Sequence, residues 1–205
     1  MHAAASDRSI EPYYERRSAE YDDWYLGAGL FADRDRPEWA DELRAVESVV
    51  SSLPPSRTLD VACGTGFLTR YLPGRVIATD SSPGMLAASR ARHAHPLVRA
   101  DAFALPFRTD GFDRVFAGHF YGHLDLVQRA RFLAESRRIA PALVVLDAAL
   151  REDVEPEQMQ ERILNDGSSH QVFKRYFTAS QLSSELGGGR VLFDGRWFVM
   201  VESQR

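Results

Sequence analysis

The sequence predicts one α/β domain with a doubly wound, mostly parallel sheet and an antiparallel strand late in the chain. Short, continuously apolar runs alternate with helical patterns between residues 58 and 148, which is typical of parallel strands covered on both faces. The first run ends in a glycine turn, Gly64 and Gly66. The last apolar stretch, 191–201, is divided by an Asp-Gly pair, a strong short-range signal for a hairpin.

The individual elements follow from hydrophobic spacing and from turn residues. Strands are expected at 58–62, 75–79, 97–100, 112–117 and 142–148, and helices at 66–72, 83–93 and 127–140. Two helices are expected before them: an aromatic stripe over 7–25, which starts near Ile10, and the segment from Trp39 to Leu53, with Pro37 in its first turn. After them, 151–169 is read as a helical or irregular excursion, 171–177 as an added strand and 179–186 as a helix.

The length and the net charge of the chain limit the classes of function that it can have. With 205 residues and 44% hydrophobic composition, 1–205 is expected to form a single soluble domain. It divides into N-terminal helices (1–55), a core (56–150) and a C-terminal excursion with its hairpin (151–205). A net charge of −4 argues against nucleic acid or an anionic membrane as a partner, and the basic pair at Arg17 is read as a solvated helix face. Without an apolar span or a signal-peptide core, the chain is expected to be cytoplasmic, as a monomer or homodimer.

The first glycine turn predicts a site for a nucleotide-like ligand. A strand that ends in glycines before a helix offers bare backbone and free N–H groups. Asp80 ends the second apolar run, 20 residues after Asp60, where a carboxylate can accept the hydroxyls of a ribose. Thr69 stands where a dinucleotide fold would have a third glycine, so a pyrophosphate ligand is disfavoured.

Four segments in order resemble the motifs of class I S-adenosylmethionine-dependent methyltransferases. They read LDVACGTG at 59–66, VIATDSSPGML at 76–86, VRADAFALPF at 98–107 and GFDRVFAGHFYGHL at 111–124. The resemblance implies a seven-stranded Rossmann-like sheet and S-adenosylmethionine as cofactor, with S-adenosylhomocysteine as product. The aromatic stripe indicates N-terminal helices that form a lid over the pocket, with core packing of the stripe as the alternative. The fourth segment departs from the [DN]-P-P-[YF] pattern of enzymes that methylate base or amide nitrogens, which lowers nucleic acid as a substrate.

The resemblance also implies which residues bind the cofactor. Asp60 would lie near its ammonium group, Asp80 would accept the ribose hydroxyls, and Asp101 with the Ala102 amide would contact the adenine. The full expected set is Tyr14, Tyr21, Asp60, Ala62, Gly64, Gly66, Asp80, Ser81, Met85, Asp101, Ala102, Phe103 and His119. Several of them have an ordinary structural alternative. Asp80 could be a helix cap, a role that Ser81 or Ser82 could take instead; Asp101 could be a turn aspartate, and Met85 and Leu86 could be core.

His119 is the candidate general base, because an unperturbed imidazole pKa near 6.5 suits proton removal at neutral pH. The alternative is that it only lines or packs under the cofactor. His119 and His123 have i, i+4 spacing, but no H-E-x-x-H pattern is present and no metal is expected.

The sequence says less about the acceptor. Residues expected to line its site come from the aromatic stripe, the fourth motif and the C-terminal excursion: Trp24, Tyr25, Phe120, Tyr121, His123, His170, Arg175 and Tyr176. The leading hypothesis is methyl transfer to an oxygen or nitrogen of a small molecule. The alternatives are a peptide or protein acceptor, a silent cofactor-binding subunit, and an NAD-linked oxidoreductase that Thr69 already disfavours.

Overall fold

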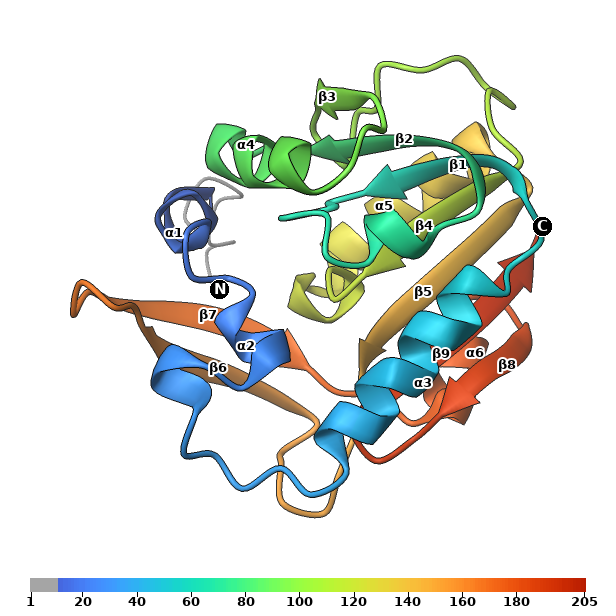
Figure 1. The fold of residues 1–205 in the computed structure, drawn as a ribbon. Coiled ribbons are helices and arrows are strands. Elements are labelled where there is room, and N and C mark those ends of the chain that lie inside the picture. The colour runs from blue at the N-terminus through green and yellow to red at the C-terminus, as the bar shows by residue number, and fades with distance from the viewer. Residues whose placement is uncertain (1–10) are drawn as a thin grey trace, which may run out of the picture.

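The computed structural model describes residues 11–205, which form one seven-stranded sheet flanked by helices, with a separate two-stranded sheet above it (Figure 1). The strand order is β3-β2-β1-β4-β5-β9-β8. Only β9 runs against its neighbours, since β1, β2, β3, β4 and β5 pair in parallel. The predicted fold class, mostly parallel with a late antiparallel hairpin, is confirmed.

The strands of this sheet follow the predicted apolar runs closely. Their bounds are β1 Ser56–Val61, β2 Gly74–Asp80, β3 Leu97–Arg99, β4 Arg114–Gly118, β5 Ala142–Ala148, β8 Arg190–Asp194 and β9 Phe198–Gln204. In β5 every residue is buried, because alternate side chains enter the two opposite layers of core. Asp194 and Gly195 make the turn between β8 and β9, as expected.

Helices cover both faces of the sheet. α5 (Leu126–Ile139) and α6 (Ala179–Glu185) pack on one face and α3 (Trp39–Ser51) on the other. α4 (Pro83–Arg92) follows β2, and its N-cap is Ser82, whose hydroxyl accepts from the Met85 N–H at 3.0 Å. Asp80 is therefore not needed as the cap and is available at the strand end.

The helix expected at 66–72 is wrong in extent. Only a 3-10 turn, η3 (Thr69–Tyr71), forms there. Pro73 lies two residues beyond the turn and favours an extended conformation of Leu72 (ψ 124°), which ends the helical segment there. Another 3-10 turn, η4 (Tyr121–His123), follows β4.

The single N-terminal helix expected over 7–25 is also wrong in its described part; Ile10 lies outside the described residues. The chain forms α1 (Glu11–Arg17), a turn, α2 (Asp23–Leu26) and the 3-10 turn η2 (Gly29–Phe31). Asp22 lies in the turn between α1 and α2 and contacts residues far away in the sequence. Its carboxylate accepts from the Thr65 hydroxyl at 2.6 Å and pairs with Arg92. Long-range polar contacts thus override the helical spacing of the aromatic residues.

The excursion at 151–169 contains a strand that the sequence analysis missed. β6 (Glu157–Ile163) pairs antiparallel with β7 (Ser169–Arg175) in a sheet of its own, so the strand expected near 171–177 exists but does not extend the main sheet. The side chains of β6 alternate between exposed and half-buried, and the half-buried ones are polar, Gln158, Gln160 and Arg162. An apolar/polar alternation is therefore absent, which hid the strand.

The two-stranded sheet and the N-terminal helices lie together at the carboxyl ends of the parallel strands (Figure 1). They touch directly: the Asn165 N–H donates to the Glu20 carboxylate at 2.9 Å, and the Tyr13 and His170 rings lie 5.2 Å apart. Sites in open α/β sheets lie at this edge. Within 11–205, no helix combines the length and apolar character that crossing a bilayer requires.

Candidate functional site

A cavity of about 390 Å³ lies at the carboxyl ends of β1, β2 and β4. Its volume is within the range of about 300–1,000 Å³ that is usual for small-molecule sites. Thirteen residues named from the sequence line it: Tyr14, Tyr21, Ala62, Gly64, Asp80, Ser81, Met85, Asp101, Ala102, Phe103, His119, Phe120 and His123. Residues of all four motifs, together with two tyrosines of the aromatic stripe, therefore converge on one space.

Gly64 and Asp80 form the polar end of this cavity. Gly64 has a left-handed φ of +57°, and a Cβ there would lie 3.8 Å from the Tyr21 ring, within the cavity. Asp80 accepts from the Gly64 N–H and from the Ser82 N–H, both at 2.9 Å. Burial raises the pKa of Asp80, although these backbone hydrogen bonds oppose the shift. Each carboxylate oxygen keeps a second lone pair for a ligand hydroxyl.

Asp60 and Gly66 lie behind this cavity rather than on its wall. Asp60 accepts from the Thr69 hydroxyl at 2.6 Å, and burial raises its pKa to about 7. It lines only a narrow crevice of about 10 Å³. A Cβ on Gly66 would meet Ser89 and His93 at 2.6 Å, so this glycine permits close packing against α4 and not a ligand contact.

The adenine-side residues expected from the third motif line the cavity in a tight turn. The Asp101 carboxylate accepts from the Phe103 N–H at 2.8 Å, which is the turn contact of the structural alternative, and Asp101 also lines the cavity. The Phe103 ring and buried Met85 give the cavity apolar walls. Leu86 does not line it.

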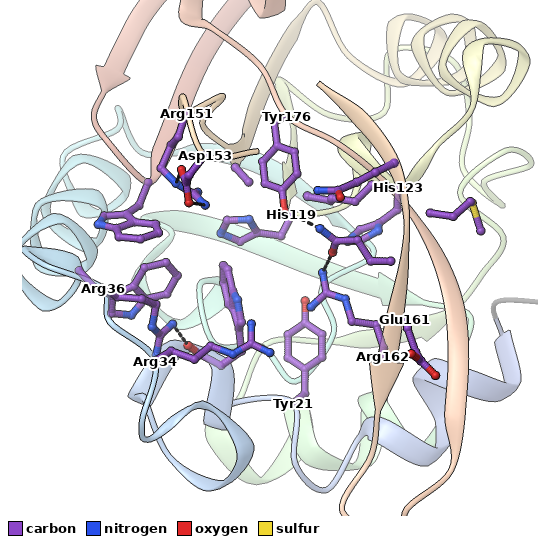
Figure 2. A pocket seen from close by; sticks show the side chains of 18 of the residues that line it. Tyr21, Arg34, Arg36, His119, His123, Arg151, Asp153, Glu161, Arg162 and Tyr176 are labelled. Atoms are coloured by element: carbon purple, nitrogen blue, oxygen red, sulfur yellow. Dashed lines mark hydrogen bonds and ion pairs between the residues drawn. The ribbon is translucent and has the colours of Figure 1, made fainter. Parts of the chain in front are cut away.

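A second cavity, of about 670 Å³, adjoins the first (Figure 2). The two share three residues, Tyr21, His119 and His123. The larger cavity is enclosed by α2, the 34–39 segment, β6, β7 and the end of β5, and it includes the predicted residues Trp24 and Tyr176. The N-terminal segment and the small sheet thus build a chamber next to the cavity that the motifs form.

His119 stands at the junction with an unusual backbone and an aromatic surround. Its φ is +55°, and its ring lies 4.9 Å from Trp24 and 5.5 Å from Phe198. Nε2 is buried and has no hydrogen-bond partner among residues 11–205. Burial lowers the pKa of His119 to about 4, so the imidazole is neutral at physiological pH but is a weaker base than the sequence suggested. A strained residue with an unpaired polar atom at such a junction is typical of a functional position.

A buried ion pair lies beside the junction. Lys174 donates to Asp147 at 2.5 Å, and Asp147 also accepts from the Gly122 N–H at 2.7 Å. Next to them, His123 Nδ1 lies 2.9 Å from the Phe173 carbonyl. These contacts join β7 of the small sheet to β5 and η4 of the main domain. Within the part of the chain that the structure describes, no three His, Cys, Asp or Glu side chains gather as a metal site would require.

Four residues expected to line the acceptor site lie elsewhere. Tyr25 is buried and stacks on Phe67 at 3.9 Å, and Tyr121 is core, 1% exposed. Arg175 is held by ion pairs to Glu157 and Glu185. His170 packs on Tyr13 and neighbours Ser168 at 3.1 Å. None of the four lines either large cavity, because each is occupied by a partner from a neighbouring element.

Several chamber residues were not identified from the sequence. Arg17, read as a solvated helix residue, is 8% exposed and donates to the Tyr13 hydroxyl at 2.7 Å. The period-two spacing of Gln158, Gln160 and Arg162 is the one local signal that could have found the β6 wall. Arg34, Arg36 and Arg151 are further cationic wall residues that the sequence did not indicate.

Comparison with known proteins bears on the 59–141 region and on the whole fold. The model of the methyltransferase domain family matches residues 59–141. A solved structure described as "DhpI-SAM-HEP complex" is 25% identical, with a TM-score of 0.77, over 98% of this chain and 99% of that one. The chain belongs to the class I S-adenosylmethionine-dependent methyltransferase superfamily. The predicted family and enzyme class are thereby confirmed, and the cofactor of the superfamily is S-adenosylmethionine.

Two curated members of the superfamily are similar over shorter stretches. The malonyl-(acyl-carrier protein) O-methyltransferase of Enterobacter lignolyticus is 31% identical over 154 residues, 72% of this chain and 60% of that protein. The demethylmenaquinone methyltransferase of Mycolicibacterium vanbaalenii is 36% identical over 99 residues, 47% of this chain and 42% of that protein. The chain therefore spans less than two thirds of the length of the curated relatives that it matches.

Proposed function

We propose that this chain transfers the methyl group of S-adenosylmethionine to an oxygen or nitrogen of a small-molecule acceptor. The observation that carries the proposal is the contact between two cavities at Tyr21, His119 and His123. The smaller cavity suits the cofactor and the larger one the acceptor. Methyl transfer is an in-line displacement, so donor and acceptor must meet across such a junction.

The smaller cavity fits S-adenosylmethionine in its chemistry. Gly64 leaves room for close approach to the backbone, and a side chain there would project into the cavity. Asp80 would hold the ribose hydroxyls, while Met85 and Phe103 would flank the adenine. When bound, S-adenosylmethionine supplies an electrophilic methyl group on a sulfonium.

The protein's own residues then orient the acceptor and exclude water. Tyr21 and Trp24, from the N-terminal segment, close the chamber over His119. The neutral imidazole can accept a hydrogen bond, or a proton, from the nucleophilic atom through its unpaired Nε2. Because the leaving group is neutral, positioning is the main task of the site.

Calorimetry and a turnover assay test this function. The chain should bind S-adenosylhomocysteine, and it should release that product from S-adenosylmethionine with at least one acceptor of a panel of hydroxylated and amino compounds. Cofactor binding without turnover on small acceptors or peptides would favour the silent-subunit alternative instead. Binding of NADH in place of S-adenosylhomocysteine would contradict the proposal.

Asp80→Ala is expected to weaken cofactor binding by about 1–3 kcal/mol, since it removes the acceptor for the ribose hydroxyls. Calorimetry with S-adenosylhomocysteine measures the effect. Asp80 also accepts two backbone N–H groups, so the melting temperature of the variant must be followed in parallel. An unchanged affinity in a folded variant would refute the ribose assignment.

His119→Ala is expected to lower turnover about 100-fold while leaving cofactor affinity nearly unchanged. The pH profile provides an independent check. Because burial holds the pKa of His119 near 4, the neutral form persists as pH falls through 6.5, and the wild-type rate should show no His119 inflection there. A near-normal rate in the variant would end the proposed role.

A further inference from the structure

The wall of the larger cavity carries an excess of positive charge. The cationic side chains that line it are Arg17, Arg34, Arg36, Arg151, Arg162 and Lys174, and the acidic ones are Asp35, Asp153 and Glu161. Two of the cations are neutralised within the protein, since Lys174 pairs with Asp147 at 2.5 Å and Arg151 with Asp153 at 2.9 Å. Four guanidinium groups remain, beside the carboxylates of Asp35 and Glu161, in a chain whose net charge is −4.

These four arginines make no ion pair with a carboxylate of residues 11–205. Arg36 donates to the Trp24 carbonyl at 2.7 Å, and Arg162 donates to the Gln160 side chain. Arg34 makes only a ring contact, with its guanidinium 4.6 Å from the centre of Phe31. Glu161, the acid next to Arg162, is exposed and accepts from the Ser169 hydroxyl at 2.6 Å. The guanidinium groups therefore keep donors for another partner.

The charges of this group also act on one another. Partial desolvation lowers the pKa of Arg34, and the charges of Arg162 and Arg17 lower it further. Burial lowers the pKa of Arg36 too, with Arg34 adding to the effect. Like charges gathered in a hollow disfavour one another, and an anion placed among them would relieve the repulsion.

The arginines lie beside the junction where methyl transfer is proposed. Figure 2 shows Arg34, Arg36 and Arg162 around the same opening, with Tyr21 and His119 in view between the elements that carry them. His119 is 7% exposed, and its Nε2 has no hydrogen-bond partner in the described chain. The same chamber is thus lined by cationic side chains and by the imidazole of His119.

We propose that the larger cavity binds an acceptor molecule that carries a small oxyanion group, a carboxylate or a phosphoryl group, on Arg34, Arg36 and Arg162. This inference rests on the proposed function, because it orients the nucleophilic atom of that acceptor toward His119 and the cofactor cavity. Guanidinium forks match both oxyanions in geometry and keep their charge at all physiological pH values. Arg17 is left out, since it packs against Tyr13 and Tyr21.

Calorimetry with two simple probes tests the site. Inorganic phosphate and acetate are titrated, at constant ionic strength, into the chain saturated with S-adenosylhomocysteine and into the chain alone. Wild-type protein is expected to bind at least one probe saturably, and the stronger probe identifies the oxyanion class. Arg34→Met/Arg162→Met is expected to weaken this binding about tenfold or more, with affinity for S-adenosylhomocysteine unchanged.

The control is Arg44→Met/Arg75→Met, which removes the same charge from two exposed arginines that line neither cavity. It should bind both probes as the wild type does. Because Arg34 is exposed and makes a single ring contact, Arg34→Met alone serves if the double variant does not fold.

Three results would overturn the proposal: no saturable binding of either probe, equal weakening in the control, or a loss of S-adenosylhomocysteine affinity that accounts for the change. The last would mean that the arginines serve the cofactor. If the wild type binds a probe but never S-adenosylhomocysteine, the proposed function fails while the oxyanion site stands.

Discussion

Gly64→Val is expected to abolish binding of S-adenosylmethionine and S-adenosylhomocysteine while leaving the chain folded. The valine Cβ would lie 3.8 Å from the Tyr21 ring and 4.0 Å from the Met85 sulfur, and its two methyl groups would occupy the cavity beside Asp80. The space that the cofactor needs would be filled, whereas the neighbouring atoms would stay in ordinary contact. Calorimetry should record no heat of binding where the wild type gives a saturable signal.

The left-handed backbone of Gly64 makes a valine there lower the stability of the fold, so the control variant must carry the same kind of backbone strain. At a φ of +57° a β-branched residue is strained by about 1–3 kcal/mol, so some loss of stability is expected. Gly167→Val carries a similar strain, with φ +81°, in the β6–β7 turn, where a Cβ would meet nothing within 4 Å. That variant should lose similar stability and keep full cofactor affinity. Binding by Gly64→Val would show that the smaller cavity is not the cofactor site.

The walls of the smaller cavity could be predicted from sequence because their determinants are local. The turn at Gly64, the acid at Asp80 and the turn at Asp101 each follow a short apolar strand, and parallel strands bring their carboxyl ends to one edge. Thr69 is another local determinant. In the sequence it replaces the third glycine of a dinucleotide fold, and in the structure its hydroxyl donates a hydrogen bond to Asp60.

Most of the larger cavity could not be predicted, because its walls depend on contacts between distant segments; of the residues predicted for the acceptor site, Trp24, His123 and Tyr176 line it. β6 has no apolar alternation, and its half-buried face meets the cavity rather than a core. Arg175 and Arg162 are both basic residues of one hairpin, yet only Arg162 lines the chamber, since Glu157 and Glu185 capture Arg175. No local pattern separates these two outcomes. Likewise, the break between α1 and α2 accompanies the remote contacts of Asp22 with Thr65 and Arg92.

Lys174→Met is expected to lower the free energy of unfolding by about 3–5 kcal/mol at pH 7, because it strands a buried carboxylate. Asp147 is completely buried and Lys174 is 5% exposed. Burial works to raise the pKa of Asp147, but the charge of Lys174 holds it below its usual value. Urea unfolding at pH 7 measures the loss. Arg44→Met, which removes an exposed partner of Asp41, should change stability little.

The pH dependence of the unfolding free energy shows whether the unpaired Asp147 carboxylate causes the loss of stability in Lys174→Met. A carboxyl group with a lowered pKa in the folded state adds stability above its unfolded pKa, near 4, and that stability is lost as pH falls through the folded value. Without Lys174, burial instead raises the pKa of Asp147, so the variant can regain stability relative to the wild type by taking up a proton. The difference in free energy of unfolding between the wild type and Lys174→Met should therefore become smaller from pH 7 toward pH 4.

Lys174→Met/Asp147→Asn removes both charges and should be less destabilised at pH 7 than Lys174→Met alone. A difference in unfolding free energy that does not change with pH, together with a double variant as unstable as Lys174→Met, would mean that the stability is lost through packing around β7. The ion pair would then not hold the small sheet on the domain.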